Sequence, residues 1–269
     1  MRAVLALVAL LSATSPGFAV TLEIVGTPIQ GGLMIGKTDP DARVTLDGRP
    51  VRVSPAGDFL VGFARDATGT QTLLVIGGDG TSQRREIDIK SRDYDIQRID
   101  GLPERQVTPT PEDLVRIQAE AREIKKARAH SAEQAFFRSG FARPADGVVS
   151  GVYGSQRILN GQARAPHFGL DLAAPEGTPV RAAADGVIAF AHAGMYFNGK
   201  TLVIDHGLGL QSIYLHLSEI SVSPGTRVFK GQPVGRIGAT GRVTGAHLHW
   251  GVQLGDIWLD PALLLESSP

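Results

Sequence analysis

Between Val20 and about Ile96, hydrophobic residues tend to recur at every second position, with polar or small residues between them. Such alternation is typical of strands that bury one face. The clearest runs are Val44–Leu46, Val51–Val53 and Phe59–Phe63. The pair Asp47-Gly48 separates the first two runs and predicts a hairpin turn. The pattern therefore predicts a small antiparallel β-sandwich over residues 20–98, and it contains no recognisable catalytic constellation.

A helical pattern follows a linker that is rich in proline. Thr110 can cap a helix whose first residue is Pro111. Apolar residues then recur at helical spacing along one stripe, at Leu114, Ile117, Ala121 and Ile124. Glu112 and Arg116 have the spacing of an ion pair, and the rest of the helix surface is charged and expected to face solvent. We therefore expect residues 99–143 to form a linker with one α-helix.

From about Gly147 the pattern changes to short apolar runs that are separated by glycine and proline. No long helical stripe occurs there, so the runs are interpreted as strands joined by turns. The sequence thus predicts a second β domain over residues 144–269 and a mostly β protein overall. Six of the seven histidines lie in this domain, and the seventh, His130, lies in the helical linker and is expected to face water.

The charge balance and the first residues narrow the choice of protein class. Lys plus Arg and Asp plus Glu both number 27, and this lack of a basic excess argues against a nucleic-acid partner.

Arg2, the apolar run Ala3–Leu11 and the small residues around Ala19 predict a secretory signal peptide over residues 1–19. No later run is apolar and long enough to span a membrane, so we expect a soluble exported chain. The absence of cysteine excludes disulfides and cysteine ligands.

Two histidines stand one residue apart in the run "GAHLHWGV", residues 245–252. The flanking apolar and β-branched residues favour a strand, where positions i and i+2 point to one face. His247 and His249 would then project side by side toward a shared target. Such a pair also arises by chance, so it is a weak signal taken alone.

A second pair strengthens the case for a metal. His167 and Asp171 occur in "PHFGLDLAAPEGTPV", where proline and glycine favour a loop entering a strand. A carboxylate between two leucines is costly to bury unless it is paired or binds a metal. A catalytic zinc takes three protein ligands and keeps one open position. His167, Asp171 and either His247 or His249 would supply two nitrogens and one oxygen, and spacing alone leaves that choice open. The alternative is that Asp171 caps a turn and His167 is a surface residue.

The segments "PHFGLD", "IYLHLS" and "GAHLHWGV" resemble the signature of the lysostaphin/LytM-type zinc metalloendopeptidases, which cut peptidoglycan peptides. The resemblance covers roughly residues 147–265, with the family's order and spacing throughout. It implies that His167, Asp171 and His249 bind one Zn2+ per chain, and that His216 and His247 are the catalytic partners. It also implies an antiparallel β domain with a long groove and the zinc on its floor.

The resemblance implies an exported zinc-dependent endopeptidase that hydrolyses peptide cross-links of peptidoglycan. The periplasm is the expected location, with secretion as the alternative, and peptidoglycan stems and cell-wall enzymes are the expected partners. One alternative is a non-catalytic envelope regulator that activates a cell-wall amidase, although none of the family's site residues is missing here. A biotinyl- or lipoyl-type carrier with Lys230 as its modified residue is less favoured, because Lys230 lacks the usual neighbours. The sequence leaves the cleaved bond and any inhibitory role of the N-terminal half open.

Overall fold

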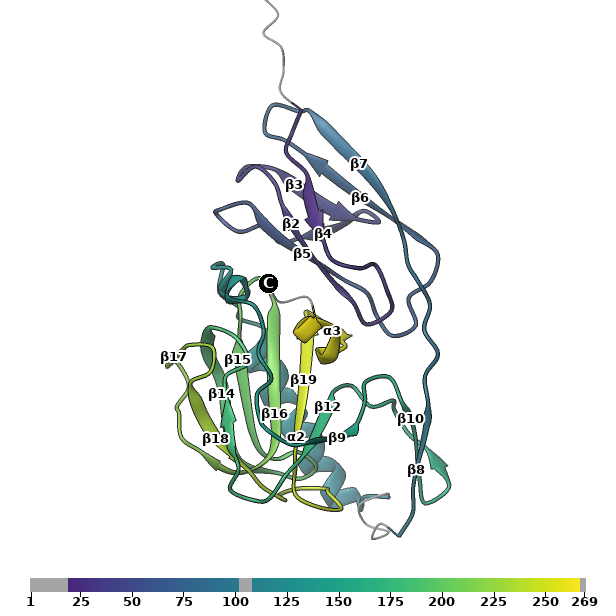
Figure 1. Ribbon diagram of the computed structural model, residues 1–269, viewed down its shortest axis with the longest axis vertical. Coiled ribbons are helices and arrows are strands. Elements are labelled where there is room, and N and C mark those ends of the chain that lie inside the picture. Colours follow the sequence, from purple (N-terminus) through teal and green to yellow (C-terminus); the bar gives the residue numbers. More distant parts are fainter. Residues whose placement is uncertain (1–18, 102–107, 267–269) are drawn as a thin grey trace, which may run out of the picture.

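The computed structural model describes residues 19–101 and 108–266 (Figure 1). Residues 1–18, nearly all of the predicted signal peptide, lie outside the described residues. Among the residues described, no helix combines the length and apolar character that crossing a bilayer requires. The structure is mostly β, with chiefly antiparallel sheets, as the sequence predicts.

The N-terminal part is a sandwich of two antiparallel sheets. One sheet consists of β1 (Glu23–Val25), β2 (Leu33–Lys37) and β5 (Asp58–Gly62). The other consists of β4 (Arg49–Val51), β3 (Arg43–Leu46), β6 (Thr70–Ile76) and β7 (Ser82–Asp88). A shared core, which includes Phe59, Phe63 and Leu73, is built from both sheets. The predicted hairpin at Asp47-Gly48 is confirmed, since both residues have positive φ and β3 pairs with β4.

Helix α2 (Pro111–Arg128) begins as predicted but buries a different face. Thr110 caps it, and the Thr110 hydroxyl and the Asp113 carboxylate accept hydrogen bonds from each other's backbone N–H. The described buried side chains of the helix are Asp113 and Glu120, because Tyr196 donates from its hydroxyl to Asp113 and from its backbone N–H to Glu120. Polar contacts with the neighbouring loop therefore decide which face of α2 is buried.

The predicted apolar stripe of α2 is correspondingly only partly buried. Leu114 remains 44% exposed, whereas Ile124 packs against the sheet below. The predicted pair of Glu112 and Arg116 is wrong, since Arg116 instead contacts Glu120 at 2.7 Å. Glu120 is the better partner because it is already fixed by its bond to the neighbouring loop.

The C-terminal part is built on a ten-stranded antiparallel sheet. Its main path runs β17 (Arg227–Val228), β14 (Gly186–Met195), β15 (Gly199–Asp205), β16 (Leu210–Ile220), β19 (His247–Leu254), β12 (Leu170–Ala173) and β9 (Val148–Gly151). The remaining strands are β13 (Pro179–Arg181), β18 (Pro233–Ile237) and β20 (Ile257–Leu259). The short helices η1 (Phe136–Ser139) and α3 (Pro261–Glu266) lie outside the sheet.

Among the strands that the structure describes, one pair is parallel, and an isolated parallel bridge also joins Ile29 to Lys90. β8 (Ile96–Ile99), which precedes the helical linker, pairs with β10 (Gln156–Leu159), and β11 (Gln162–Ala163) completes this small sheet. Figure 1 shows β8 and β10 together beside the large sheet. A segment from before the helix thus becomes part of the C-terminal structure, which alternation along the chain does not predict.

The two faces of the large sheet serve different purposes. One face packs into the main hydrophobic core, through residues such as Tyr214, Leu248 and Trp250. The opposite face carries a smaller apolar cluster of Val203, Ile213 and Leu215, against which Ile124 of α2 packs. Since side chains alternate along a strand, residues 247, 249, 251 and 253 of β19 share this second face.

Polar and apolar contacts join the N-terminal sandwich to the large sheet. The Asp260 N–H donates to the Gly31 carbonyl at 2.8 Å, and Arg138 Nε donates to Asp58 at 3.0 Å. Leu60 of β5 belongs to the main core of the C-terminal part. The two parts are therefore packed against each other (Figure 1).

His206 is a buried histidine whose ring hydrogen bonds hold a turn together. Its Nδ1 donates to the Asp185 carbonyl at 2.7 Å, and its Nε2 lies 2.7 Å from the Ser212 hydroxyl. Burial lowers the pKa of His206 below its ordinary value, so the native ring is neutral. The unfolded chain therefore binds a proton near pH 6.5 that the native chain does not.

We expect the free energy of unfolding to decrease as the pH falls below about 6.5, by up to about 1.4 kcal/mol per pH unit for this one group. The measurement is urea unfolding between pH 7.5 and 5.0. His206→Gln should show a shallower slope than the unsubstituted chain, whereas exposed His130→Gln should keep the full slope. An unchanged slope in His206→Gln would show that His206 is not the titrating group.

Candidate metal centre

Three side chains converge on one point at the second face of the large sheet. Asp171 on β12 lies directly opposite His249 on β19, and His167 lies in the loop that enters β12. His249 Nδ1 is 2.8 Å from Asp171 Oδ1, and His167 Nε2 is 3.0 Å from the same oxygen and 2.9 Å from His249 Nδ1. These three form the group of His, Asp and Glu side chains, among the residues described, whose geometry could hold a metal ion.

The hydrogen bonds around these atoms are consistent with a bound cation between them. The Val152 carbonyl, 3.0 Å from His167 Nδ1, can only accept, so that nitrogen carries the hydrogen. The other ring nitrogen, Nε2, points at the Asp171 carboxylate and at His249 Nδ1. Three possible ligand atoms this close together are stabilised by a cation among them. Two nitrogens and one carboxylate oxygen are the donor set of a catalytic zinc site.

Asp171 is ionised in this setting. Burial raises the pKa of Asp171, but the hydrogen bonds and charges of His167 and His249 outweigh burial and hold the pKa well below its usual range. Arg157 Nη2 lies 3.4 Å from the other carboxylate oxygen, Oδ2, which directs Oδ1 toward the two imidazoles. The carboxylate is thus oriented on both sides, as is usual for a metal ligand.

His247 lies beside this group rather than within it. Its Nε2 is 4.0 Å from Asp171 Oδ1, compared with 2.8 Å for His249 Nδ1. Its Nδ1 lies 2.9 Å from the Gly245 carbonyl and carries the hydrogen of that bond. Its Nε2 is therefore the ring nitrogen that can interact with a bound substrate or water.

His216 reaches the same face because β16 is irregular there. Leu215 packs in the small cluster while Leu217 packs in the main core, so two residues of equal parity point to opposite faces. His216 stands between them with φ of 65°, and its ring centroid is 4.9 Å from that of His247. Without this irregularity, strict alternation would place His216 on the core face with Tyr214.

The electrostatic state of His216 is set by its surroundings. Burial, followed by the charges of His249 and His247, lowers the pKa of His216 to about 3, so the ring is neutral near pH 7. Its Nδ1 lies 2.9 Å from the Thr240 carbonyl and carries the hydrogen. Its Nε2 therefore offers a lone pair that can accept a hydrogen bond from water.

A small cavity of about 160 Å3 opens over the centre. Its walls include Gln97 and Ile99 of β8, Arg157 of β10, and Arg242, as well as His216 and His247. Reasoning from the sequence did not identify Gln97, Ile99 or Arg157. Arg157 lies in the segment "YGSQR" that is part of the family resemblance, but the two β8 residues gave no signal.

Two glycines allow the ligands to pack closely. A Cβ atom at Gly151 would lie 2.4 Å from Asp171 Oδ2, and one at Gly169 would lie 2.5 Å from His249 Cε1. Any side chain at either position would displace a candidate ligand. Gly169 lies within the "PHFGLD" segment, so the sequence contained this signal.

The structure brings all five of the predicted site residues together: His167, Asp171, His216, His247 and His249. The other three histidines lie elsewhere, with His130 exposed on the linker and His192 accepting a hydrogen bond from the Gly194 N–H. Lys230, the residue of the carrier alternative, donates from its amine to the Ser139 carbonyl and from its backbone to Asp185.

Comparison with known proteins finds a family whose match includes these residues. The sequence profile of Peptidase family M23 matches residues 165–261, which include all five site residues. The chain is 42% identical over 104 residues to the DD-carboxypeptidase/endopeptidase Mpg of Neisseria meningitidis, covering 38% of this chain and 24% of that protein. It is 49% identical over 86 residues to the peptidoglycan DD-endopeptidase ShyA of Vibrio cholerae, covering 32% of this chain and 20% of that protein. The matched part of this chain thus spans about a quarter or less of the length of these curated relatives.

A solved structure extends the likeness to the N-terminal half. A Pseudomonas aeruginosa protein, whose crystal structure is described as that of a peptidase M23, superposes with a TM-score of 0.69 at 32% identity. The likeness covers 89% of this chain and 95% of that protein, so it extends well beyond residues 165–261. The chain therefore belongs to peptidase family M23.

Proposed function

We propose that this protein is an exported zinc-dependent endopeptidase that hydrolyses peptide cross-links of peptidoglycan. The observation that carries the proposal is the convergence of His167, Asp171 and His249 with two further imidazoles at their side. The relatives support it, because ShyA is named as a peptidoglycan DD-endopeptidase and Mpg as a DD-carboxypeptidase/endopeptidase.

The proposed chemistry divides the five residues into two groups. His167, Asp171 and His249 would hold one zinc ion, which supplies a Lewis acid that polarises the scissile carbonyl and acidifies the attacking water. His216 and His247 direct their Nε2 atoms into the space beside the ligands. There they orient the attacking water and stabilise the negative charge that develops on the carbonyl oxygen.

The proposal includes a domain organisation for the chain and a cellular location for the protein. We infer that residues 1–19 are a signal peptide, residues 20–98 the N-terminal domain, residues 99–143 the linker and residues 144–269 the peptidase domain. Export places the protein with its substrate, in the periplasm or outside the cell. Peptidoglycan stems and cross-links are the proposed partners, together with other cell-wall enzymes.

The test is the digestion of purified peptidoglycan sacculi by the chain without residues 1–19. We expect cross-linked muropeptides to decrease and uncross-linked stems to appear, as measured by mass spectrometry of the products. A zinc chelator should stop the reaction and added Zn2+ should restore it, because the metal supplies the Lewis acid. The products also identify which peptide bond is cleaved.

The same experiment separates the proposal from its rival. A chain that binds zinc yet releases no products from sacculi would contradict the endopeptidase proposal. Addition of a cell-wall amidase, with release measured again, would then test the regulator that the sequence leaves as the alternative.

A further inference from the structure

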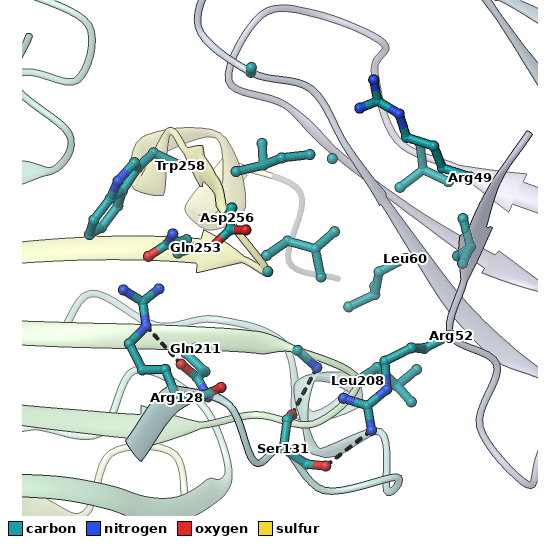
Figure 2. A pocket seen from close by; sticks show the side chains of 18 of the residues that line it. Arg49, Arg52, Leu60, Arg128, Ser131, Leu208, Gln211, Gln253, Asp256 and Trp258 are labelled. Atoms are coloured by element: carbon teal, nitrogen blue, oxygen red, sulfur yellow. Dashed lines mark hydrogen bonds between the residues drawn. The ribbon is translucent and has the colours of Figure 1, made fainter. Parts of the chain in front are cut away.

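A large cleft lies between the N-terminal sandwich, helix α2 and the large sheet, separate from the cavity over the metal centre. Its volume is about 980 Å3, at the upper end of the range for ligand sites. Figure 2 shows Arg49, Arg52 and Leu60 of the sandwich on one side, facing Arg128, Gln211 and Trp258 across the opening. The cleft and the cavity over the metal centre have no lining residue in common.

The lining combines an apolar surface with an excess of positive charge. The apolar part includes Leu60, Leu208, Leu254 and the indole of Trp258. The charged part holds four cations, Arg49, Arg52, Lys125 and Arg128, against two carboxylates, Asp47 and Asp256. This composition fits a ligand that carries carboxylates together with small apolar groups.

Two amide oxygens in the lining lack hydrogen-bond donors. Gln253 is only 7% exposed, and its Oε1 is buried without a partner, as is Oε1 of Gln71. Both residues line the cleft. A buried acceptor without a donor is unfavourable by about 1–3 kcal/mol. A rotation of either side-chain amide that turns its oxygen into the cleft would let it accept from the N–H groups of a ligand, and peptides offer such groups at regular intervals.

The cleft and the metal centre lie on the same face of the large sheet. Gln253 and His249 lie four residues apart on β19 and share one face of the sheet. Strand geometry separates their Cα atoms by roughly 13 Å. Gln211 of β16, which pairs with Gln253, lies on the same face and accepts a hydrogen bond from Arg128. A molecule held in the cleft is therefore held close to the site of hydrolysis.

We propose that this cleft is a second, non-catalytic binding site for an uncross-linked peptidoglycan stem peptide, a short peptide rich in carboxylates. This inference rests on the proposed function, because the stem is part of the same polymer as the proposed substrate. The volume accommodates a few residues of peptide, whereas a folded protein partner normally buries about 1,200–2,000 Å2 in an interface. The site would hold the enzyme on the polymer and give the N-terminal sandwich a share in substrate binding.

The test is binding of a synthetic tripeptide, L-alanyl-γ-D-glutamyl-diaminopimelate, to the full mature chain. This probe has no D-alanyl bond to hydrolyse, so binding is measured apart from catalysis. Trp258 lines the cleft and Trp250 is buried in the core, so a change in tryptophan fluorescence reports on the cleft. We expect saturable binding that weakens at least fivefold when the carboxylates of the probe are converted to amides.

Matched variants assign the binding to the cleft. Arg49→Gln/Lys125→Gln removes two exposed cations of the lining and should weaken binding at least fivefold. Arg84→Gln/Lys126→Gln makes the same change in charge on the same two elements of the fold, the sandwich and α2, outside the lining, and should bind normally.

Equal binding by the two double variants would overturn the proposal. So would equal or tighter binding of Ala-Glu-Glu with ordinary α linkages, which would indicate an acidic protein segment as the occupant. Failure of the endopeptidase proposal would look different, since the tripeptide would still bind while sacculi remained intact.

Discussion

Alanine substitution of His167, Asp171 or His249 is expected to reduce bound zinc from one ion per chain to nearly none and to abolish hydrolysis of sacculi. Each substitution removes one of three donor atoms that lie within 3.0 Å of one another. A site with two protein ligands no longer has the set that a catalytic zinc requires. We expect the affinity for zinc to fall by more than the 10–100-fold that follows loss of an outer partner of a ligand.

Zinc content after gel filtration and the rate of product release from sacculi are the two measurements for this prediction. His130→Ala is the matched control, because His130 is an exposed histidine outside the site, and it should keep both zinc and activity. Circular dichroism checks that each variant is folded. Retention of one zinc per chain in all three variants would show that the metal is held elsewhere.

Alternation along the chain was sufficient to predict the face on which the chemistry lies. Leu248 and Trp250 are buried in the main core, and the residues between and beside them, His247 and His249, point to the other face. The same rule places Asp171 on that face, because its neighbours in sequence, Leu170 and Leu172, belong to the core. The alternation along each strand is therefore enough to predict that Asp171, His247 and His249 lie on one face of the sheet.

Alternation could not select His249 over His247, because it treats residues i and i+2 alike. The resemblance to a family made that choice, and cross-strand register supplies the physical reason. His249 lies directly opposite Asp171, whereas His247 lies opposite Ala173, one pair further along the strand. Register depends on pairing between distant segments, which a single strand's pattern does not contain.

His216 shows a second limit of reasoning from the pattern. Its side chain reaches the site through a positive φ within an irregular stretch of β16, and neither feature has a signature in "SIYLHLS". A non-glycine residue in this region is strained by about 1–3 kcal/mol. Such strain persists only where surrounding contacts hold it, and here the His216 N–H donates to the Asn198 carbonyl and Nδ1 donates to Thr240. These contacts come from separate loops.

Alanine substitution of His247 is expected to leave one zinc ion per chain while lowering the rate of hydrolysis about 10²–10⁴-fold. Zinc binding should persist while hydrolysis slows, because His247 Nε2 lies 4.0 Å from Asp171 Oδ1. This places it outside the close contacts that join His167, Asp171 and His249. Within the described part of the chain, the substitution breaks one side-chain hydrogen bond, to the Gly245 carbonyl at the surface, so we expect the fold to persist. The measurements are zinc content and the turnover number, kcat, on a soluble cross-linked muropeptide dimer.

His249→Ala is the matched comparison on the same strand and face, and it should lose zinc and activity together. Equal loss of zinc in the two variants would contradict the division of roles between the two histidines, and full activity in His247→Ala would remove it from the catalytic group.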